Sequence, residues 1–126
     1  EKLFYMVTDA PWPVSDRDSV FRSILTQDPA SGIVTIDMQA EPDSFPPNDD
    51  FLRIRQMRGM WQFIPRADGV VKVIYQVHAE PGGGIPAWLA NSVVVDNPYQ
   101  TLKQMREMVR QPVYQRTEIN HIKDTD

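Results

Sequence analysis

Cysteine is absent from the 126 residues, so the chain has no disulfide framework, no thiolate nucleophile and no zinc site built on thiolates. Basic residues are also few. The 13 Lys and Arg are outnumbered by 17 Asp and Glu, which gives a net charge of −4 without the basic stripe of a nucleic-acid binder. We therefore expect no nucleic-acid partner.

Long apolar runs are missing as well. No segment approaches the roughly 20 residues that span a bilayer as a helix, which predicts a soluble chain. The sequence starts at Glu1 without an apolar leader, and we expect that an N-terminal piece has been lost. The compartment stays open; a bacterial periplasmic location would follow if the missing piece carried a signal peptide.

The composition is that of one ordinary globular domain, with 41% hydrophobic and 24% charged residues. Its 11 prolines fall between short periodic segments. Alternation and β-branched or aromatic residues predict strands at 3–8, 19–26, 33–40, 51–64 and 70–79. We expect the second and third to form an antiparallel hairpin. Gly59 is expected to mark a bulge or a bend in the fourth.

After residue 86 the apolar residues follow helical spacing, at Leu89, Val93, Leu102, Met105 and Val109. Pro98 is expected to kink or restart this helix, with Asp96 or Asn97 as a cap, and Pro112 to end it. The prediction is an α+β domain of five antiparallel strands and one long C-terminal helix laid across a curved sheet. A groove between them would suit an apolar ligand.

The sequence offers little for catalysis. It has no nucleophile elbow, P-loop or dinucleotide fingerprint, and its carboxylates fit no metal spacing. His121 lies in the polar tail, and His78 is predicted to point away from the apolar face of its strand. Residues 81–84 could hold an anion at the helix start, but a strand-to-helix turn accounts better for their glycines. We expect no enzyme, cofactor or metal.

Two aromatic residues stand apart from the predicted core: Phe45 in the loop 41–50, and Trp88 at the helix start. An exposed aromatic residue at a cavity rim indicates a ligand gate or transient contact with a membrane surface. A hydrophobic staple that holds the loop is an equal alternative. Arg17 and Asp18, neighbours at the mouth of the second strand, are expected to form a half-buried pair that orients it.

Several motifs resemble the StAR-related lipid transfer (START) domain family, in a wording closer to its bacterial members. They are Pro11–Asp18, Gly59–Trp61, Pro65 with Asp68-Gly69, and Pro81–Asn91 (PGGGIPAWLAN), of which the last is the most specific. The resemblance spans residues 1–111 and leaves 112–126 as a polar tail. It implies the C-terminal part of a helix-grip fold whose N-terminal helix and first strands are missing from this chain.

The resemblance further implies a tunnel for a sterol or another apolar lipid, with the C-terminal helix as its lid and the loop 41–50 as its gate. Several family members carry a cavity Arg where this chain has Ser23, which favours a sterol or neutral lipid over a phosphate headgroup. Strand alternation gives the inward residues. The predicted ligand-binding set is Phe21, Ser23, Leu25, Val34, Ile36, Met38, Met57, Trp61, Val73, Tyr75, Val77, Leu89 and Val93.

Two other functions stay open. An enzyme of the wider helix-grip superfamily, a cyclase or hydrolase acting on an apolar substrate, would place Asp37, His78 or Glu80 in the cavity. A module that takes a partner helix would show an open groove instead of a tunnel. If upstream strands are absent, the strand 3–8 is an exposed hydrophobic edge, and we expect the fragment to dimerise, swap elements or aggregate through it.

Overall fold

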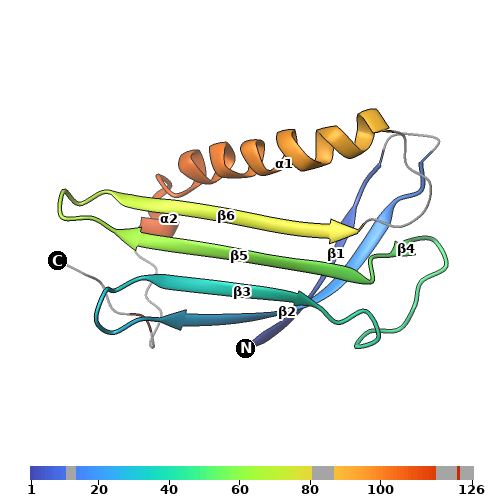
Figure 1. The fold of residues 1–126 in the computed structure, drawn as a ribbon, viewed down its shortest axis with the longest axis horizontal. Coiled ribbons are helices and arrows are strands. Elements are labelled where there is room, and N and C mark those ends of the chain that lie inside the picture. Colours follow the sequence, from blue (N-terminus) through green and yellow to red (C-terminus); the bar gives the residue numbers. More distant parts are fainter. Residues whose placement is uncertain (11–13, 81–86, 116–121, 123–126) are drawn as a thin grey trace.

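The computed structural model describes residues 1–10, 14–80, 87–115 and 122, with the backbone alone for 87–97. Within these ranges one mixed sheet is followed by a long helix and a short one (Figure 1). The strands are β1 (Lys2–Thr8), β2 (Arg17–Gln27), β3 (Val34–Ala40), β4 (Leu52–Arg53), β5 (Gln56–Pro65) and β6 (Val71–Glu80). The helices are α1 (Ala87–Met108) and α2 (Pro112–Gln115).

The sheet has the order β1-β2-β3-β5-β6, and each of these neighbours is antiparallel. The two-residue β4 pairs in parallel with the start of β2. The predicted hairpin is confirmed as β2 and β3, in register from Phe21 opposite Ala40 to Gln27 opposite Val34. Asp28 shapes its turn, accepting hydrogen bonds from the Ala30 N–H and the Ser31 hydroxyl, both at 2.9 Å. The largely antiparallel sheet and the long helix that follows it confirm the predicted α+β class.

The predicted bulge at Gly59 is wrong. The register of β5 against both neighbours runs through Gly59 without a step, so that this residue lies opposite Met38 on one side and Val77 on the other. A Cβ atom at position 59 would lie 2.6 Å from the Met38 Cε. Glycine is therefore explained by the space that the methionine side chain takes. The break in the predicted strand 51–64 falls between β4 and β5 instead.

α1 runs alongside β6 and packs against it (Figure 1). Of its described side chains, Pro98, Thr101, Leu102 and Met105 are half-buried, a spacing that places them on one side of the helix. The expected restart near Pro98, with a new cap, is wrong because one helix continues through that residue. The helix ends at Met108, and Pro112 begins α2, a position that suits proline.

β1 forms one edge of the sheet, and every one of its residues is exposed. Leu3, Phe4, Tyr5, Met6 and Val7 are between 39% and 47% exposed. β2 covers only one side of this strand in the described part of the chain. The hydrophobic edge expected from the sequence is present.

Candidate functional site

The strand register places every strand residue of the predicted ligand-binding set on a single face of the sheet. Residues directly opposite each other in neighbouring strands point to the same side. One row across four strands joins Leu25, Ile36, Trp61 and Tyr75. The neighbouring rows join Ser23, Met38, Gly59 and Val77, then Phe21, Ala40, Met57 and Ala79, and on the other flank Gln27, Val34, Phe63 and Val73. We call this the apolar face.

Aromatic rings stack across the apolar face. The Trp61 and Tyr75 rings lie 4.2 Å apart between centroids, and Trp61 and Phe63 lie 6.1 Å apart. On the β1 side, Phe4 stacks on Phe21 at 5.4 Å. Such offset pairs stabilise the arrangement beyond their buried area. Phe4 and Phe63 were missed in the sequence, although the same alternation that marks Trp61 also marks Phe63, two residues further on.

Most of the apolar face is only half-covered by the described residues. Among the described residues, Val20 is the only hydrophobic side chain that is buried, and it lies on the other side of the sheet. On the apolar face, by contrast, the exposure is intermediate for Phe21, Leu25, Ile36 and Trp61. Burial raises the pKa of the Tyr75 hydroxyl above its usual value. This face therefore offers a wide apolar surface that the chain's own described side chains do not seal.

One polar atom beside the apolar face has no partner among the described residues. Ser19 pairs with Met6 of β1 and points to the same side as Phe21 and Ser23. Its side chain is 1% exposed, and its hydroxyl makes no hydrogen bond to the part of the chain that the structure describes. A buried hydroxyl without a partner destabilises the folded state. Ser19 is thus a buried polar residue at one end of the apolar face.

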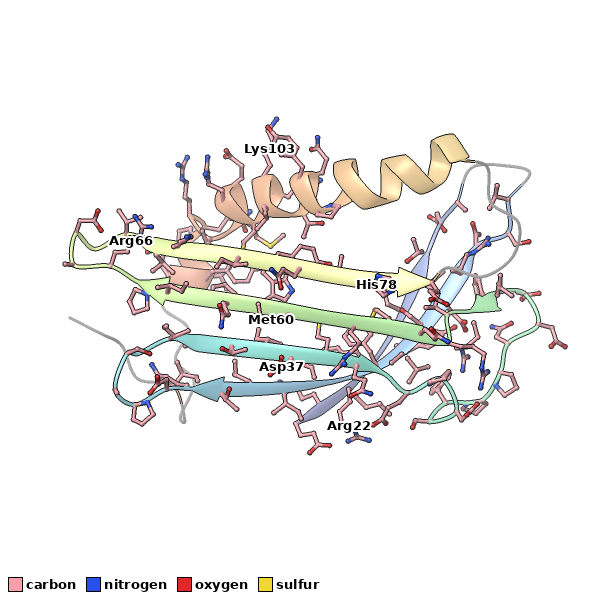
Figure 2. The ribbon with its side chains drawn as sticks, in the orientation of Figure 1. Arg22, Asp37, Met60, Arg66, His78 and Lys103 are labelled. Carbon is pink, nitrogen blue, oxygen red and sulfur yellow. The ribbon has the colours of Figure 1, made fainter. Side chains whose placement is uncertain are left out.

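The acidic residues and the histidine of β3 and β6 lie on the other side, which we call the opposite face. Asp37 and His78 are exposed there, as is Glu80 (Figure 2 labels the first two). His78 lies opposite Arg58 of β5 and points away from the apolar face, as predicted. No group of three or more His, Cys, Asp or Glu able to hold a metal occurs among the described residues. The described helices also include none long and apolar enough to cross a membrane.

The opposite face carries a buried ion pair that the sequence did not reveal. Asp18 is 1% exposed, and its carboxylate oxygens accept hydrogen bonds from the Arg53 Nε at 2.8 Å and the Arg53 Nη2 at 2.9 Å. The Tyr5 hydroxyl donates a third, at 2.9 Å. The expected Arg17–Asp18 pairing is wrong, because successive strand residues point to opposite sides of the sheet. Arg17 donates instead to the Ser15 carbonyl.

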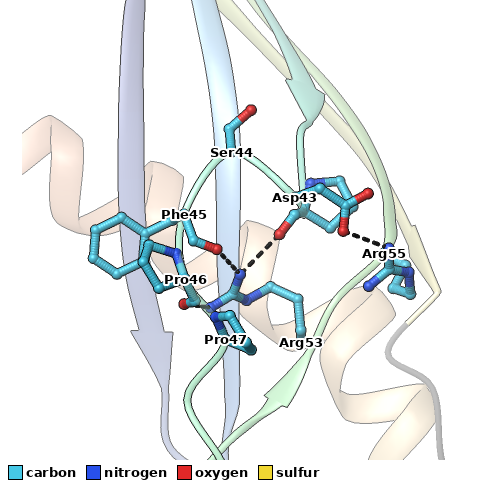
Figure 3. Close-up of a pocket in the computed structure, with 8 residues that line it drawn as sticks. Asp43, Ser44, Phe45, Pro46, Pro47, Arg53 and Arg55 are labelled. Atoms are coloured by element: carbon cyan, nitrogen blue, oxygen red, sulfur yellow. Dashed lines mark hydrogen bonds and ion pairs between the residues drawn. The ribbon is translucent and has the colours of Figure 1, made fainter.

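Arg53 also holds the loop that joins β3 to β4. Its Nη1 donates to the carbonyls of Pro42 at 2.8 Å and Phe45 at 3.0 Å, and its Nη2 donates to the carbonyl of Pro46 at 2.9 Å. Together with the two bonds to Asp18, all five guanidinium N–H donors have acceptors. Figure 3 shows these carbonyls turned toward the guanidinium. We call Asp18, Arg53 and the three carbonyls the arginine clamp.

The clamp shifts the ionisation of its members. Hydrogen bonds from Arg53 hold the pKa of Asp18 below its usual range, against the raising effect of burial. Asp18 in turn raises the pKa of Arg53. Burial, and then the hydrogen bond to Asp18, raises the pKa of Tyr5. The pair is therefore charged, and Tyr5 neutral, across the physiological range.

Phe45 does not lie at the rim of the apolar face. Its ring stacks on Tyr5 at 4.7 Å, and Tyr5 shares the opposite face with Asp18 and Val20. Figure 3 shows the loop on one side of β1 and β2 and α1 on the other. Of the two interpretations of Phe45, the contacts support the staple, and the role as a gate or membrane contact stays a prediction. The loop residues line a hollow of about 510 Å³, together with Arg53 and Arg55.

A second ion pair fixes the start of the same loop. Arg22 donates from Nη2 to Glu41 at 2.7 Å, and Ser44 donates to the same carboxylate at 3.0 Å. The hydrogen bonds from Arg22 lower the pKa of Glu41. Contacts along the first part of the loop, from Glu41 to Pro46, therefore tie it to the opposite face.

The lid residues of the predicted set cannot be placed. The backbone of Leu89 and Val93 lies in α1, as does that of Trp88, but their side chains lie outside the described residues. What the structure does place is the helix itself, on the side of the sheet that bears the apolar face (Figure 3).

An antiparallel sheet with one apolar face turned toward a long C-terminal helix is a helix-grip α+β architecture. The chain matches the START domain over residues 1–114 and belongs to this family. An uncharacterised protein of Pseudomonas aeruginosa is 44% identical over 102 residues, which make up 81% of this chain and 50% of that protein. The chain thus spans about half the length of this relative.

A solved structure of another protein is also similar to this chain in sequence and fold. The crystal structure of a STAR-related lipid transfer protein (fragment 25–204) from Xanthomonas axonopodis is 41% identical, with a TM-score of 0.75. The match covers 87% of this chain and 66% of that one.

Proposed function

We propose that this chain binds an apolar lipid noncovalently in the space bounded by the apolar face and α1, and that it serves lipid transfer. The observation that carries the proposal is the continuous apolar strip that the register assembles from five strands. Membership of the START domain family and the likeness to the lipid transfer protein of Xanthomonas support it.

Burial supplies the affinity. A lipid that removes about 300–400 Å² of apolar surface from water gains roughly 8–10 kcal/mol at ~25 cal/mol per Å². The loss of translational freedom and the ordering of the lipid reduce this gain. No bond is made or broken, and α1 acts as the lid that opens for entry and exit.

The positions of the acids and histidine argue against catalysis on an apolar substrate. Such an enzyme needs an acid–base pair directed at the substrate. Asp37, His78 and Glu80 all lie on the opposite face, exposed to solvent. Binding without chemical change is therefore the function that the geometry supports best.

We further propose a sterol or another neutral lipid as the ligand. Ser23 lies in the row of Met38 and Val77, where a hydroxyl can bond a sterol hydroxyl or a carbonyl. No carboxylate lies in the rows of the apolar face. The exposed edge of β1 is proposed as the surface through which two copies of this chain pair.

Two neighbouring residues of β2 provide a matched test. Leu25 and Ile24 are isomers, but Leu25 lies on the apolar face and Ile24, 43% exposed, on the opposite one. Leu25→Gln puts an unpaired amide into the ligand site, and we expect it to weaken binding of the fluorescent sterol dehydroergosterol by about tenfold. Ile24→Gln should leave binding unchanged.

Native mass spectrometry of the purified chain, followed by organic extraction, gives the bound lipid and the oligomeric state together. A pyrene-labelled phosphatidylcholine serves as the comparison for dehydroergosterol. The proposal would be contradicted if the two glutamine variants changed sterol binding equally. It would also be contradicted if the chain bound neither probe and no lipid were recovered by extraction. Tighter binding of the phosphatidylcholine would contradict the preference for a sterol alone.

A further inference from the structure

A basic stripe runs along the solvent side of α1 and into the turn that follows it. Tyr99, Lys103 and Arg106 follow one another at steps of four and three residues, which places them on one side of the helix, and Arg110 lies in the turn just after the helix ends at Met108. All four are exposed. The half-buried residues Pro98, Thr101, Leu102 and Met105 lie on the other side, and Figure 2 shows Lys103 pointing away from the sheet.

The cations of the basic stripe are available. Lys103, Arg106 and Arg110 make no ion pair with any residue that the structure describes. Between residues 99 and 114 they are accompanied by a single acid, Glu107. The segment is therefore positive, although the whole chain has a net charge of −4.

Negative charge lies elsewhere. The loop 41–50 holds four acids, of which Glu41 and Asp43 are paired with Arg22 and Arg55, and Asp49 and Asp50 make no ion pair with a described residue. In Figure 1 this loop lies at one end of the long axis, and the end of α1 that bears the basic stripe lies toward the other. An approaching anionic surface would therefore attract one end of the molecule and repel the other, which fixes the orientation of the encounter.

Exposed apolar and aromatic side chains flank the basic stripe. Tyr99 is 63% exposed, Met108 50% and Tyr114 49%. A hydrogen bond of 2.6 Å from the Gln115 amide to the Val109 carbonyl ties α2, and with it Tyr114, to the end of α1. Tyrosine is favoured at membrane interfaces, where its ring is in an apolar setting and its hydroxyl is hydrated.

We propose that the basic stripe docks this chain on an anionic lipid bilayer. Cations beside exposed tyrosines and a methionine match a surface of anionic headgroups over an apolar layer. A polyanion without an apolar layer would leave Tyr99 and Met108 unused. The proposal goes beyond lipid binding at the apolar face, and it places the outer side of the lid helix against the membrane.

Co-flotation with vesicles tests the proposal. The probes are vesicles of phosphatidylcholine alone and with about one third phosphatidylglycerol. The variant K103Q/R106Q/R110Q removes the basic stripe. Because one cation near an anionic surface changes affinity about fivefold, equivalent to ~1 kcal/mol, we expect the three substitutions to weaken binding about a hundredfold. Binding of the unmodified chain should also disappear in ~0.5 M salt.

A second triple variant controls for net charge. R55Q/R58Q/K72Q changes the charge by the same amount at exposed positions outside α1. It should bind the anionic vesicles as the unmodified chain does. Equal losses in both variants, equal binding to neutral vesicles, or binding to duplex DNA without binding to vesicles would overturn the proposal. Dehydroergosterol binding, measured without vesicles, should be the same in both variants, which separates docking from ligand binding.

Discussion

Replacing Arg53 by Met tests the arginine clamp most directly. The substitution keeps an aliphatic stem but removes all five donors, and it leaves the carboxylate of Asp18, which is 1% exposed, with the Tyr5 hydroxyl as its side-chain partner. Breaking a buried ion pair in this way destabilises a protein by about 3–5 kcal/mol. Since small domains have a total stability of about 5–15 kcal/mol, the loss is a large part of it.

The pKa of Asp18 predicts whether stability rises or falls with pH. In the unmodified chain the pKa of Asp18 is lowered by Arg53, so its stabilising effect is present above its unfolded pKa of about 4 and is lost as the pH falls through the folded value. Without Arg53, the burial that raises the pKa of Asp18 is opposed only by the hydrogen bonds from Tyr5 and from the backbone of Asp18 itself. The variant should therefore lose most of the gain in stability that the unmodified chain shows as the pH rises from about 4.

Urea unfolding followed by tryptophan fluorescence between pH 4 and 7 measures both effects. Arg55→Met is the matched control, because Arg55 lies two residues away and its pair with Asp43 is exposed, with side chains 62% and 85% accessible. An exposed pair contributes about 0–1 kcal/mol. If the two variants lose the same stability, or if Arg53→Met keeps the pH slope of the unmodified chain, the reasoning about the clamp is refuted.

Two further predictions concern the apolar face. Ser19→Ala should keep or raise the urea midpoint, by up to about 1 kcal/mol, because it removes a buried hydroxyl without a partner; a loss above about 1 kcal/mol would mean that this hydroxyl is satisfied. Gly59→Ala should lose about 1 kcal/mol, because the new Cβ meets only the flexible tip of Met38 at 2.6 Å. Adding Met38→Ala should make the two losses less than additive, and strict additivity would contradict the contact.

The apolar face could be predicted because a strand has a period of two. Once Ile36 and Trp61 are assigned to one side, alternation alone fixes which of their strand neighbours lie beside them, and the register agrees in every strand. Helical spacing likewise predicted α1, apart from the effect of Pro98. These features depend on residues a few positions apart, which a single sequence displays.

The arginine clamp could not be predicted in this way. Asp18 and Arg53 are 35 positions apart, and they meet only because β4 returns to pair with the start of β2. No local pattern in the sequence announces a two-residue strand. For the same reason the contacts that hold the loop 41–50 could not be predicted. Its position depends on Phe45 meeting Tyr5 and on carbonyls meeting Arg53.

The clamp recognises the loop through its backbone. The three acceptors that it takes from Pro42, Phe45 and Pro46 are main-chain carbonyls, which any residue would offer. The hydrogen bonds of Arg53 therefore depend on the spacing of these carbonyls along the chain and not on the identity of the side chains. The outward side chains of this loop can therefore be substituted as long as the length of the loop is kept. A single inserted residue between Pro42 and Pro46 would displace the carbonyls from the guanidinium and break these hydrogen bonds.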